Sequence, residues 1–501
     1  MIPYSTIIQL DRKIGTPVYI QLCNQLIQLI KQGKLSPATK LPGSRLMAEQ
    51  LSIHRKTVVA AYDELMAQGW LESKPAKGTF VNTALPIVKS RTIAKEHFSK
   101  KAEIPKKEAG FSFHSKAHLN RPDSTAQKEG VITLDDGVPD SRIAPIEEIA
   151  RTYRSIVQKS YNRKLLTYGS IYGNGELRET LASYLNETRG LAIQSENILI
   201  TRGSQMGIYL AGKLLLESEG NIVVGTTNYR SANKTFIESG GVLNKVNVDD
   251  KGLITDEIAA LCQQKNIKAV YVTSHHHHPT TVTLSAERRM HLLELSQQYN
   301  FAIIEDDYDY DFHYNNAPIL PLASGDEQGN VVYIGALCKI VAPAIRVGYM
   351  VAPSNFVDEA ARYRRIIDRQ GDALLEAVMA RMIKNGDVQR HSKKALKIYK
   401  DRRDLFCSLL KEKLGKYFEF EIPEGGMAVW AMLKKPYSWD ELRKEAATQN
   451  LAIADYCWDR EENDPVMLQG MRLGFASLNE EEIREAVNRL ALTFQSLDSK
   501  I

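Results

Sequence analysis

Short apolar runs alternate with helix-length segments along residues 131–501, and this alternation constrains the fold more than any other feature of the sequence. The runs are rich in valine and isoleucine, which favour extended strands. Strands joined by helices form a mostly parallel sheet with both faces covered, so we predict an α/β fold. The runs span residues 197–201, 221–225, 268–273, 302–305 and 331–334.

The N-terminal part of the chain has a different pattern. Apolar residues recur at helical spacing within residues 17–33, a short helix is expected to begin at Ser44, and a third helix is expected over residues 55–68. Two short strands flank residues 74–78, which are basic and contain glycine. Three helices followed by a basic hairpin predict a winged helix-turn-helix, and a generic three-helix bundle is the alternative.

Polar and cationic residues lie where such a domain contacts double-stranded DNA. The third helix would enter the major groove by its N-terminal end, the hairpin would approach the backbone or the minor groove, and the start of the second helix would clamp a phosphate. The candidate DNA-binding residues are Arg55, Lys56 and Thr57 on the third helix, Lys77 and Gly78 on the hairpin, and Arg45 on the second helix.

The charge distribution divides the chain in the same place. Residues 1–130 contain 20 Lys and Arg against 10 Asp and Glu, whereas residues 131–501 contain 45 against 50. A basic head on a mildly acidic body indicates a nucleic-acid module joined to a second domain, and a solvated basic surface is the alternative. Residues 83–130 lack apolar periodicity and are predicted to be a basic tether, which either adds salt-dependent DNA affinity or serves as a spacer. We therefore predict domains at 1–82 and 131–501.

Other features predict a cytoplasmic protein. No apolar run approaches the roughly 20 residues of a membrane-spanning helix, and the N-terminus lacks the parts of a secretory signal. The five cysteines are scattered without paired spacing, which is typical of reduced thiols in a cytosol.

A lysine and an arginine follow the last predicted strand. Lys339 comes after a turn of small residues, Arg346 follows seven residues later, and Asp306 and Asp307 end the strand before. An imine-forming lysine, a carboxylate partner and an anion-binding arginine are the parts that hold pyridoxal phosphate. A solvated acidic loop or a divalent-metal site is the alternative for the carboxylates.

Three other strand ends carry candidate ligand-binding residues. Gly203 and Ser204 open a predicted helix, where backbone amides make a phosphate seat. Tyr229 could stack on a flat ring, or be an ordinary half-buried tyrosine. The four histidines of residues 275–278 could bind zinc or nickel, or form a loop beside the ligand site.

Specific motifs resemble known families. Residues 17–81 resemble the GntR-family DNA-binding domain through Leu-Pro-Gly-Ser-Arg at 41–45 and Gly-Thr-Phe-Val at 78–81. Residues 131–501 resemble the fold-type-I (class I/II) aminotransferase domain, and the whole chain resembles the MocR-type (GabR/PdxR-like) regulators. The stretches that carry the second resemblance are residues 136–142, 168–178, 184–190, 200–205, 270–273, 305–309, 339, 346–349 and 471–475.

The resemblance implies roles around pyridoxal phosphate. The pyridine nitrogen would face Asp306, the ring hydroxyl would face Tyr308, and the ring would stack on Tyr229. His278 stands where aminotransferases use asparagine. The residues that would hold the phosphate are Gly203, Ser204, Gln205 and Arg346.

The resemblance also implies a reactive lysine and a carboxylate-binding arginine. Lys339 would carry the imine, and Arg472 would pair with the carboxylate of a substrate or effector in bidentate fashion. The family implies a homodimer, and a two-fold symmetric dimer would bind paired DNA half-sites.

The sequence departs from the family at several positions. Ala336 and Cys338 replace the Thr and Ser whose hydroxyls help to bind the phosphate. Residues 225–228 are Gly-Thr-Thr-Asn in place of Glu-Asp-Pro-Gly, and an arginine that often follows the stacking tyrosine is absent, with Ser231 and Asn233 in that region. We expect cofactor binding that is weaker or tuned to an unusual ligand.

These features together predict a transcriptional regulator. It would sense a small amine, an amino acid or pyridoxal phosphate itself through an imine at Lys339, and ligand exchange there would shift the body between states that position the DNA-binding heads. The alternatives are a genuine pyridoxal-phosphate-dependent aminotransferase with a fused DNA-binding domain, and a repressor whose cofactor site is empty.

Overall fold

The computed structural model describes residues 3–13, 15–85, 109, 111–116, 119, 130–314, 319–454 and 470–500. The chain divides into two compact units, Met1–His114 and Ser115–Ile501. Most of the predicted tether, residues 83–130, falls outside the described residues, so its limits stay a prediction. No helix in the described ranges has the length and apolar surface that a bilayer crossing requires.

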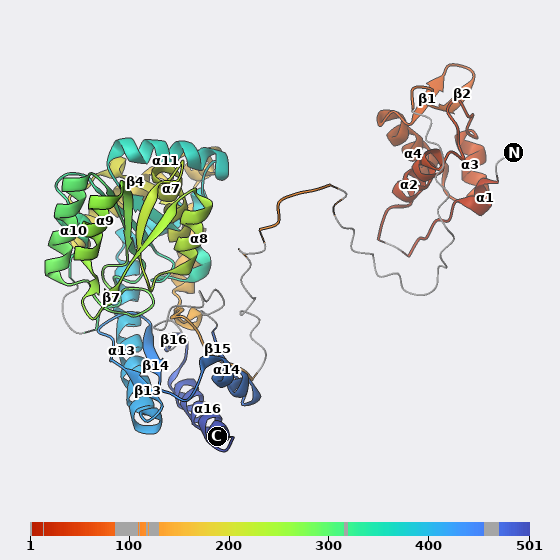
Figure 1. The fold of residues 1–501 in the computed structure, drawn as a ribbon. Coiled ribbons are helices and arrows are strands. Elements are labelled where there is room, and N and C mark those ends of the chain that lie inside the picture. The colour runs from red at the N-terminus through yellow and green to blue at the C-terminus, as the bar shows by residue number, and fades with distance from the viewer. Residues whose placement is uncertain are drawn as a thin grey trace. The chain divides into compact units, whose positions relative to one another are not determined.

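The N-terminal unit contains the predicted helices and hairpin (Figure 1). The hairpin strands are antiparallel, and Leu71 pairs with Val81. Leu22, Val58 and Leu65 are fully buried where the helices meet. The elements are α1 (Tyr4–Ile7), α2 (Val18–Lys31), α3 (Ser44–Gln50), α4 (Arg55–Ala67), β1 (Leu71–Lys74) and β2 (Gly78–Val81).

A seven-stranded sheet forms the centre of the C-terminal unit, in the order β4-β12-β11-β10-β9-β5-β6. Its strands are parallel except β12, which is antiparallel to both of its neighbours. The strands are β4 (Ile198–Thr201), β5 (Asn221–Gly225), β6 (Val242–Val246), β9 (Ile267–Val272), β10 (Ala302–Asp307), β11 (Val331–Ala336) and β12 (Gly348–Val351).

Alternate residues of these strands enter two apolar cores, one on each face of the sheet. Leu199 packs into one core, whereas its neighbours Ile198 and Ile200 pack into the other. This alternation confirms the predicted α/β sheet with both faces covered. The helices of the large subdomain are α5 (Ile146–Val157), α6 (Gly175–Arg189), α7 (Ser204–Leu215), α8 (Arg230–Glu238), α9 (Thr255–Gln264), α10 (Ala286–Tyr299), α11 (Ser354–Ile367) and α12 (Ala373–Lys384), with the short strands β7 (Val248–Asp249) and β8 (Gly252–Leu253).

A smaller subdomain with its own core follows at the C-terminal end of the chain. A three-stranded antiparallel sheet, β13-β14-β16, lies beside helices, and β3 from the start of the unit pairs in parallel with β15. The elements are α13 (Asp387–Leu414), β13 (Phe418–Phe420), β14 (Ala428–Leu433), α14 (Trp439–Thr448), β15 (Leu451–Ile453), β16 (Gly470–Gly474), α16 (Glu480–Asp498) and β3 (Ile132–Leu134).

Candidate active site

The topology brings the predicted site residues to one edge of the central sheet. Strands β4, β5, β9, β10 and β11 all run in the same direction. Ligands in such sheets bind outside the carboxyl ends of the strands. The residues at those ends are Gly203 and Ser204 after β4, Tyr229 after β5, His278 after β9, Asp306 and Tyr308 at the end of β10, and Lys339 after β11.

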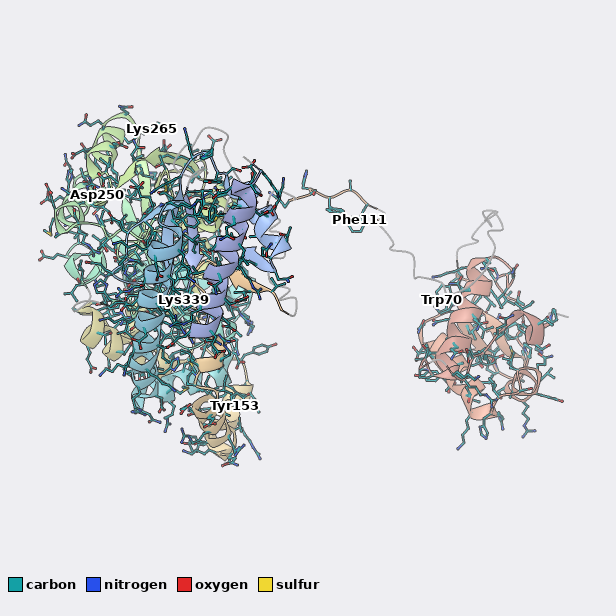
Figure 2. The ribbon with its side chains drawn as sticks, turned by 90° about the horizontal axis from the view of Figure 1, so that it is seen from below. Trp70, Phe111, Tyr153, Asp250, Lys265 and Lys339 are labelled. Atoms are coloured by element: carbon teal, nitrogen blue, oxygen red, sulfur yellow. The ribbon has the colours of Figure 1, made fainter. Side chains whose placement is uncertain are left out.

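Lys339 is half-buried, whereas Asp250 and Lys265 of the same unit are exposed; Figure 2 labels all three residues. Nζ of Lys339 donates a hydrogen bond of 2.8 Å to the carbonyl oxygen of Gly137. Burial lowers the pKa of Lys339, and the charge of Arg472 lowers it further, against the opposing effect of Asp136. A lysine whose pKa is lowered has a larger fraction of the neutral amine that attacks carbonyl groups.

Asp306 is a buried carboxyl with one unused oxygen. Its Oδ2 accepts a hydrogen bond of 2.7 Å from the hydroxyl of Tyr271, while Oδ1 has no hydrogen-bond partner among the described residues. Burial raises the pKa of Asp306 to about 7. Oδ1 lacks a hydrogen-bond donor, and the protonated pyridine nitrogen of pyridoxal phosphate is such a donor. Asp306 therefore fits the cofactor.

Gly203 and Arg346, which are predicted to hold the phosphate, lie close together. Gly203 precedes α7 with a φ of +75°, and a Cβ atom there would lie 2.5 Å from Nη2 of Arg346. Nη2 donates to the carbonyl oxygen of Arg202 at 2.9 Å. The first turn of α7, with Ser204, therefore presents amides beside a guanidinium, which suits an anion. The side chain of Gln205 instead donates to Thr235 at 2.6 Å.

Cys338 lies against the same guanidinium. Its Sγ is 3.8 Å from Nη1 of Arg346 and 3.7 Å from the carbonyl oxygen of Val347. Burial raises the pKa of the Cys338 thiol, so the sulfur is held as a neutral thiol. A thiol is a weaker hydrogen-bond partner than a hydroxyl. Cys338 therefore gives Arg346 and a bound phosphate weaker hydrogen bonds than a serine at this position would.

Aromatic rings lie around His278. The ring of Tyr229 is 5.1 Å from that of His278 in an edge-on arrangement, and the ring of Tyr308 is 6.1 Å away. The hydroxyl of Tyr308 donates to the carbonyl oxygen of His276 at 3.0 Å. The stacking role of Tyr229 and the ring-hydroxyl role of Tyr308 stay predictions.

An ion-pair cluster around Arg472 was not predicted. Nε of Arg472 lies 3.2 Å from Oδ1 of Asp136 and donates to the backbone oxygen of the same residue at 3.1 Å. Nε2 of His278 lies 3.3 Å from both carboxylate oxygens of Asp136. Burial opposes the ionisation of Asp136, but His278, Arg472 and Lys339 together lower its pKa to about 2. The sequence signal for this cluster is the pair of aspartates at 135 and 136.

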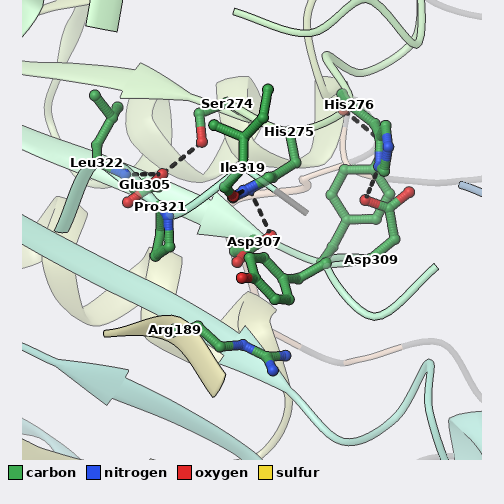
Figure 3. A network of polar contacts seen from close by, with 12 residues as sticks. Arg189, Ser274, His275, His276, Glu305, Asp307, Asp309, Ile319, Pro321 and Leu322 are labelled. Atoms are coloured by element: carbon green, nitrogen blue, oxygen red, sulfur yellow. Dashed lines mark hydrogen bonds and ion pairs between the residues drawn. The ribbon is translucent and has the colours of Figure 1, made fainter. Parts of the chain in front are cut away.

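The histidine tract forms a loop after β9, and Figure 3 shows His275 beside Asp307 and His276 beside Asp309. Nδ1 of His276 lies 2.8 Å from Oδ1 of Asp309, and Nδ1 of His275 lies 3.2 Å from Oδ1 of Asp307. Nε2 of His277 lies 2.7 Å from the backbone oxygen of Thr227, and burial lowers its pKa to about 4. Among the residues that the structure describes, no group of three or more His, Cys, Asp or Glu side chains is suited to a metal ion.

The predicted DNA-binding residues lie on the surface of the N-terminal unit. His54 caps α4, since its Nδ1 accepts from the amide of Lys56 at 3.2 Å. Nε of Arg55 donates to Oγ of Ser44 at 3.2 Å, which ties the start of α4 to the start of α3. The exposed residues of the set are Arg45, Arg55, Lys56, Lys77 and Gly78, and Thr57 is half-buried.

Comparisons with known proteins identify the family of each unit. Residues 129–490 match the family model described as aminotransferase class I and II. The chain belongs to the class I and II aminotransferase family. Residues 18–81 match the model described as bacterial regulatory proteins, gntR family. This aminotransferase-family chain therefore has the two-domain composition of MocR-type regulators. The aminotransferase family implies pyridoxal phosphate as cofactor, and the gntR-type domain implies DNA binding.

Individual relatives cover either both units or the C-terminal unit. The chain is 26% identical to the probable rhizopine catabolism regulatory protein MocR of Rhizobium meliloti, over 98% of this chain and 96% of the relative. It is 30% identical to aromatic-amino-acid aminotransferase 1 of Thermococcus litoralis, over 73% of this chain and 88% of the relative. The crystal structure of the multiple substrate aminotransferase from Thermococcus profundus superposes with a TM-score of 0.69 at 28% identity, covering 78% of this chain and 98% of that one.

Proposed function

We propose that this MocR-type regulator binds pyridoxal phosphate at Lys339 and regulates transcription in response to a small amine, an amino acid or the cofactor itself. The observation that carries the proposal is the convergence of Lys339, Asp306 and Arg346 at one sheet edge in a chain with a gntR-type DNA-binding domain. When bound, pyridoxal phosphate supplies an aldehyde that condenses reversibly with primary amines.

The residues of this chain hold and orient that group. Oδ1 of Asp306 would accept a hydrogen bond from the protonated ring nitrogen, and the hydroxyl of Tyr271 fixes the carboxyl from its other side at 2.7 Å. The first turn of α7 and Arg346 hold the phosphate. The carbonyl oxygen of Gly137 accepts a hydrogen bond of 2.8 Å from Nζ of Lys339 and so orients the lysine. The site thus has a nucleophilic amine fixed between a carboxyl and an anion seat.

A ligand at this site regulates DNA binding only if it binds two states of the protein with different affinity. The family implies a homodimer, and two-fold symmetry presents two α4 helices to paired half-sites. We propose such a dimer as the DNA-binding form. The protein is proposed to reside in the cytoplasm, where promoter DNA and the cofactor are both present.

Absorption spectroscopy tests the proposal. The full-length protein mixed with pyridoxal phosphate should gain a visible absorption band that is absent from Lys339→Ala. Its affinity for promoter DNA, selected from a random duplex pool, should change when the cofactor or an amine is added. A protein without the band, or a Lys339→Ala variant identical to wild type, contradicts the cofactor. Sustained turnover of an amino acid with a keto acid would instead identify an aminotransferase.

A further inference from the structure

Arg472 is a buried cation that already has a carboxylate partner within the chain. The residue is 1% exposed, and a buried charge is costly unless it is paired. Asp136 meets this need with Oδ1 at 3.2 Å and with its backbone oxygen at 3.1 Å, both from Nε. Nη1 donates to the carbonyl oxygen of Pro279 at 3.4 Å. The chain therefore neutralises the arginine without a ligand.

Two neighbouring side chains favour the ionised carboxylate of Asp136, and the backbone next to it is fixed by a hydrogen bond. His278 approaches its two oxygens at 3.3 Å, and the charge of Lys339 favours the ionised carboxylate. The amide of Gly137, its neighbour in the chain, is fixed by Oδ1 of Asp135 at 2.8 Å. The carboxylate of Asp136 is thus part of a built cluster between the reactive lysine and the arginine.

The position of this carboxylate determines which ligands fit. A ligand whose amino group reaches Lys339 and whose α-carboxylate reaches Arg472 would place that carboxylate beside the ionised Asp136. Two carboxylates at one cation repel each other, whereas a ligand without a carboxylate meets no such charge. Asp136 already occupies the Nε side of the guanidinium, so the α-carboxylate of an amino acid would have to share the cation with it.

We propose that Asp136 acts as a built-in substitute for the ligand carboxylate, so that the effector is a primary amine without an α-carboxylate. The inference rests on the proposed function, since it specifies the ligand class of the same site. It distinguishes this chain from an aminotransferase that leaves its arginine available to the carboxylate of an amino acid. Asp136 is a specificity-determining residue under this proposal.

Matched ligand pairs test the inference on the full-length protein loaded with pyridoxal phosphate. Tyramine and tyrosine, and cadaverine and lysine, differ only in the α-carboxylate. Titration of the visible band should give an amine affinity about tenfold or more above that of the matching amino acid. In Asp136→Asn the preference for the amine over the amino acid should shrink by about tenfold or reverse. The neutral asparagine no longer pairs with the charge of Arg472, so the carboxylate of the ligand can do so.

Two controls make the result specific. Asp250→Asn removes the same charge from an exposed position and should keep the wild-type ratio. Asp136→Ser provides a second variant if the asparagine variant does not fold. The ratio of amine affinity to amino-acid affinity in the wild type tests the inference without either variant. Equal or tighter binding of the amino acids by wild type, or an Asp136→Asn ratio equal to the wild-type one, overturns the inference.

The failure of the proposed function is distinguishable from the failure of this inference. A protein that takes up no pyridoxal phosphate contradicts the proposed function alone. Calorimetry with succinate on the cofactor-free protein then decides the role of Asp136. Succinate binding to Asp136→Asn but not to wild type supports the role, and binding to wild type or to neither protein overturns it.

Discussion

Gly203 and Arg346 lie so close that a Cβ atom at residue 203 would meet the guanidinium at 2.5 Å. The glycine also has a φ of +75° and a ψ of +175°, a backbone region that is nearly restricted to glycine. The contact explains why the turn after β4 has a glycine at this position, since a side chain there would meet the guanidinium of Arg346.

Gly203→Ala should therefore displace Arg346 and weaken the binding of pyridoxal phosphate by about tenfold or more. The strained backbone should also cost about 1–3 kcal/mol of stability. Absorption titration and thermal melting measure the two effects. Gly175→Ala, where an added Cβ meets nothing within 4 Å, should change neither. An alanine variant at 203 with wild-type affinity would place the phosphate elsewhere.

Cys338→Ser should strengthen cofactor binding. The serine hydroxyl would occupy nearly the same volume as the thiol beside Arg346 and would be a better hydrogen-bond donor to a phosphate. We expect an affinity gain of up to about tenfold, measured by competition with an excess of a carbonyl-trapping reagent. Cys262→Ser, in the half-buried C-terminal part of α9, is the control for a cysteine lost elsewhere. Unchanged or weaker binding by Cys338→Ser would mean that the residue does not face the phosphate.

The pKa of Asp306 predicts a pH dependence of stability. Folding raises this pKa from 3.8 to about 7, so the folded protein binds a proton that the unfolded chain releases. The contribution of this group is fully present below about pH 4 and is lost as the pH rises through about 7, with a slope of about 1.4 kcal/mol per pH unit between them. In the cofactor-free protein, Asp306→Asn should remove this slope.

Asp307 provides the internal control for that experiment. Its pKa is lowered because the charges of His275 and Arg189 outweigh the effect of burial. Its contribution is present above the ordinary pKa of an aspartate and is lost only at lower pH. Because the charge of Asp307 also raises the pKa of Asp306, Asp307→Asn should move the slope to lower pH without removing it. Urea unfolding at a series of pH values measures both variants. Equal slopes for wild type and Asp306→Asn would show that Asp306 is ionised throughout.

Arg55→Ala should weaken binding to selected promoter DNA by about 1–3 kcal/mol, because the N-terminal end of α4 is the expected base-reading surface. Arg55→Lys keeps the charge but loses the planar fork, so it should recover affinity for random DNA and not specificity. Fluorescence anisotropy with both duplexes gives the specificity ratio. A ratio unchanged in Arg55→Ala would exclude this residue from base recognition.

Lys77→Ala should act differently from Arg55→Ala. The lysine is exposed at the hairpin turn, where a phosphate contact is expected. Loss of one phosphate contact reduces the slope of log affinity against log salt by about 1 and leaves the preference among sequences unchanged. Anisotropy at several salt concentrations tests this. A changed sequence preference would instead assign the hairpin a role in base or groove recognition.

The local elements could be predicted because each has a local signal. The run at 221–225 is β5, and the helix expected over residues 55–68 is α4 (Arg55–Ala67). Strand β10 is longer than its apolar run at 302–305, because it also includes Asp306 and Asp307, whose burial depends on tertiary partners. The antiparallel strand β12 was not predicted, because four residues between two turns carry little periodicity.

The site was predictable only in part. Positions at the ends of strands follow from the fold, so Lys339 and Asp306 could be placed from the sequence alone. The pairing of Asp136 with Arg472 joins residues 336 positions apart, so the aspartates at 135 and 136 mark one side of the cluster but do not identify its partner. The engagement of Gln205 with Thr235 was missed for the same reason.

Strand β3 ends at Leu134, three residues before the carbonyl that holds Lys339. The same strand continues at its other end into the segment that leads to the DNA-binding domain, and it is fixed to β15 through Ile132 and Leu451. Along the chain, β3 therefore lies between residue 130 and the segment that contacts Lys339. We expect a displacement of Asp136 or Gly137 to act first on β3 and on its pairing with β15.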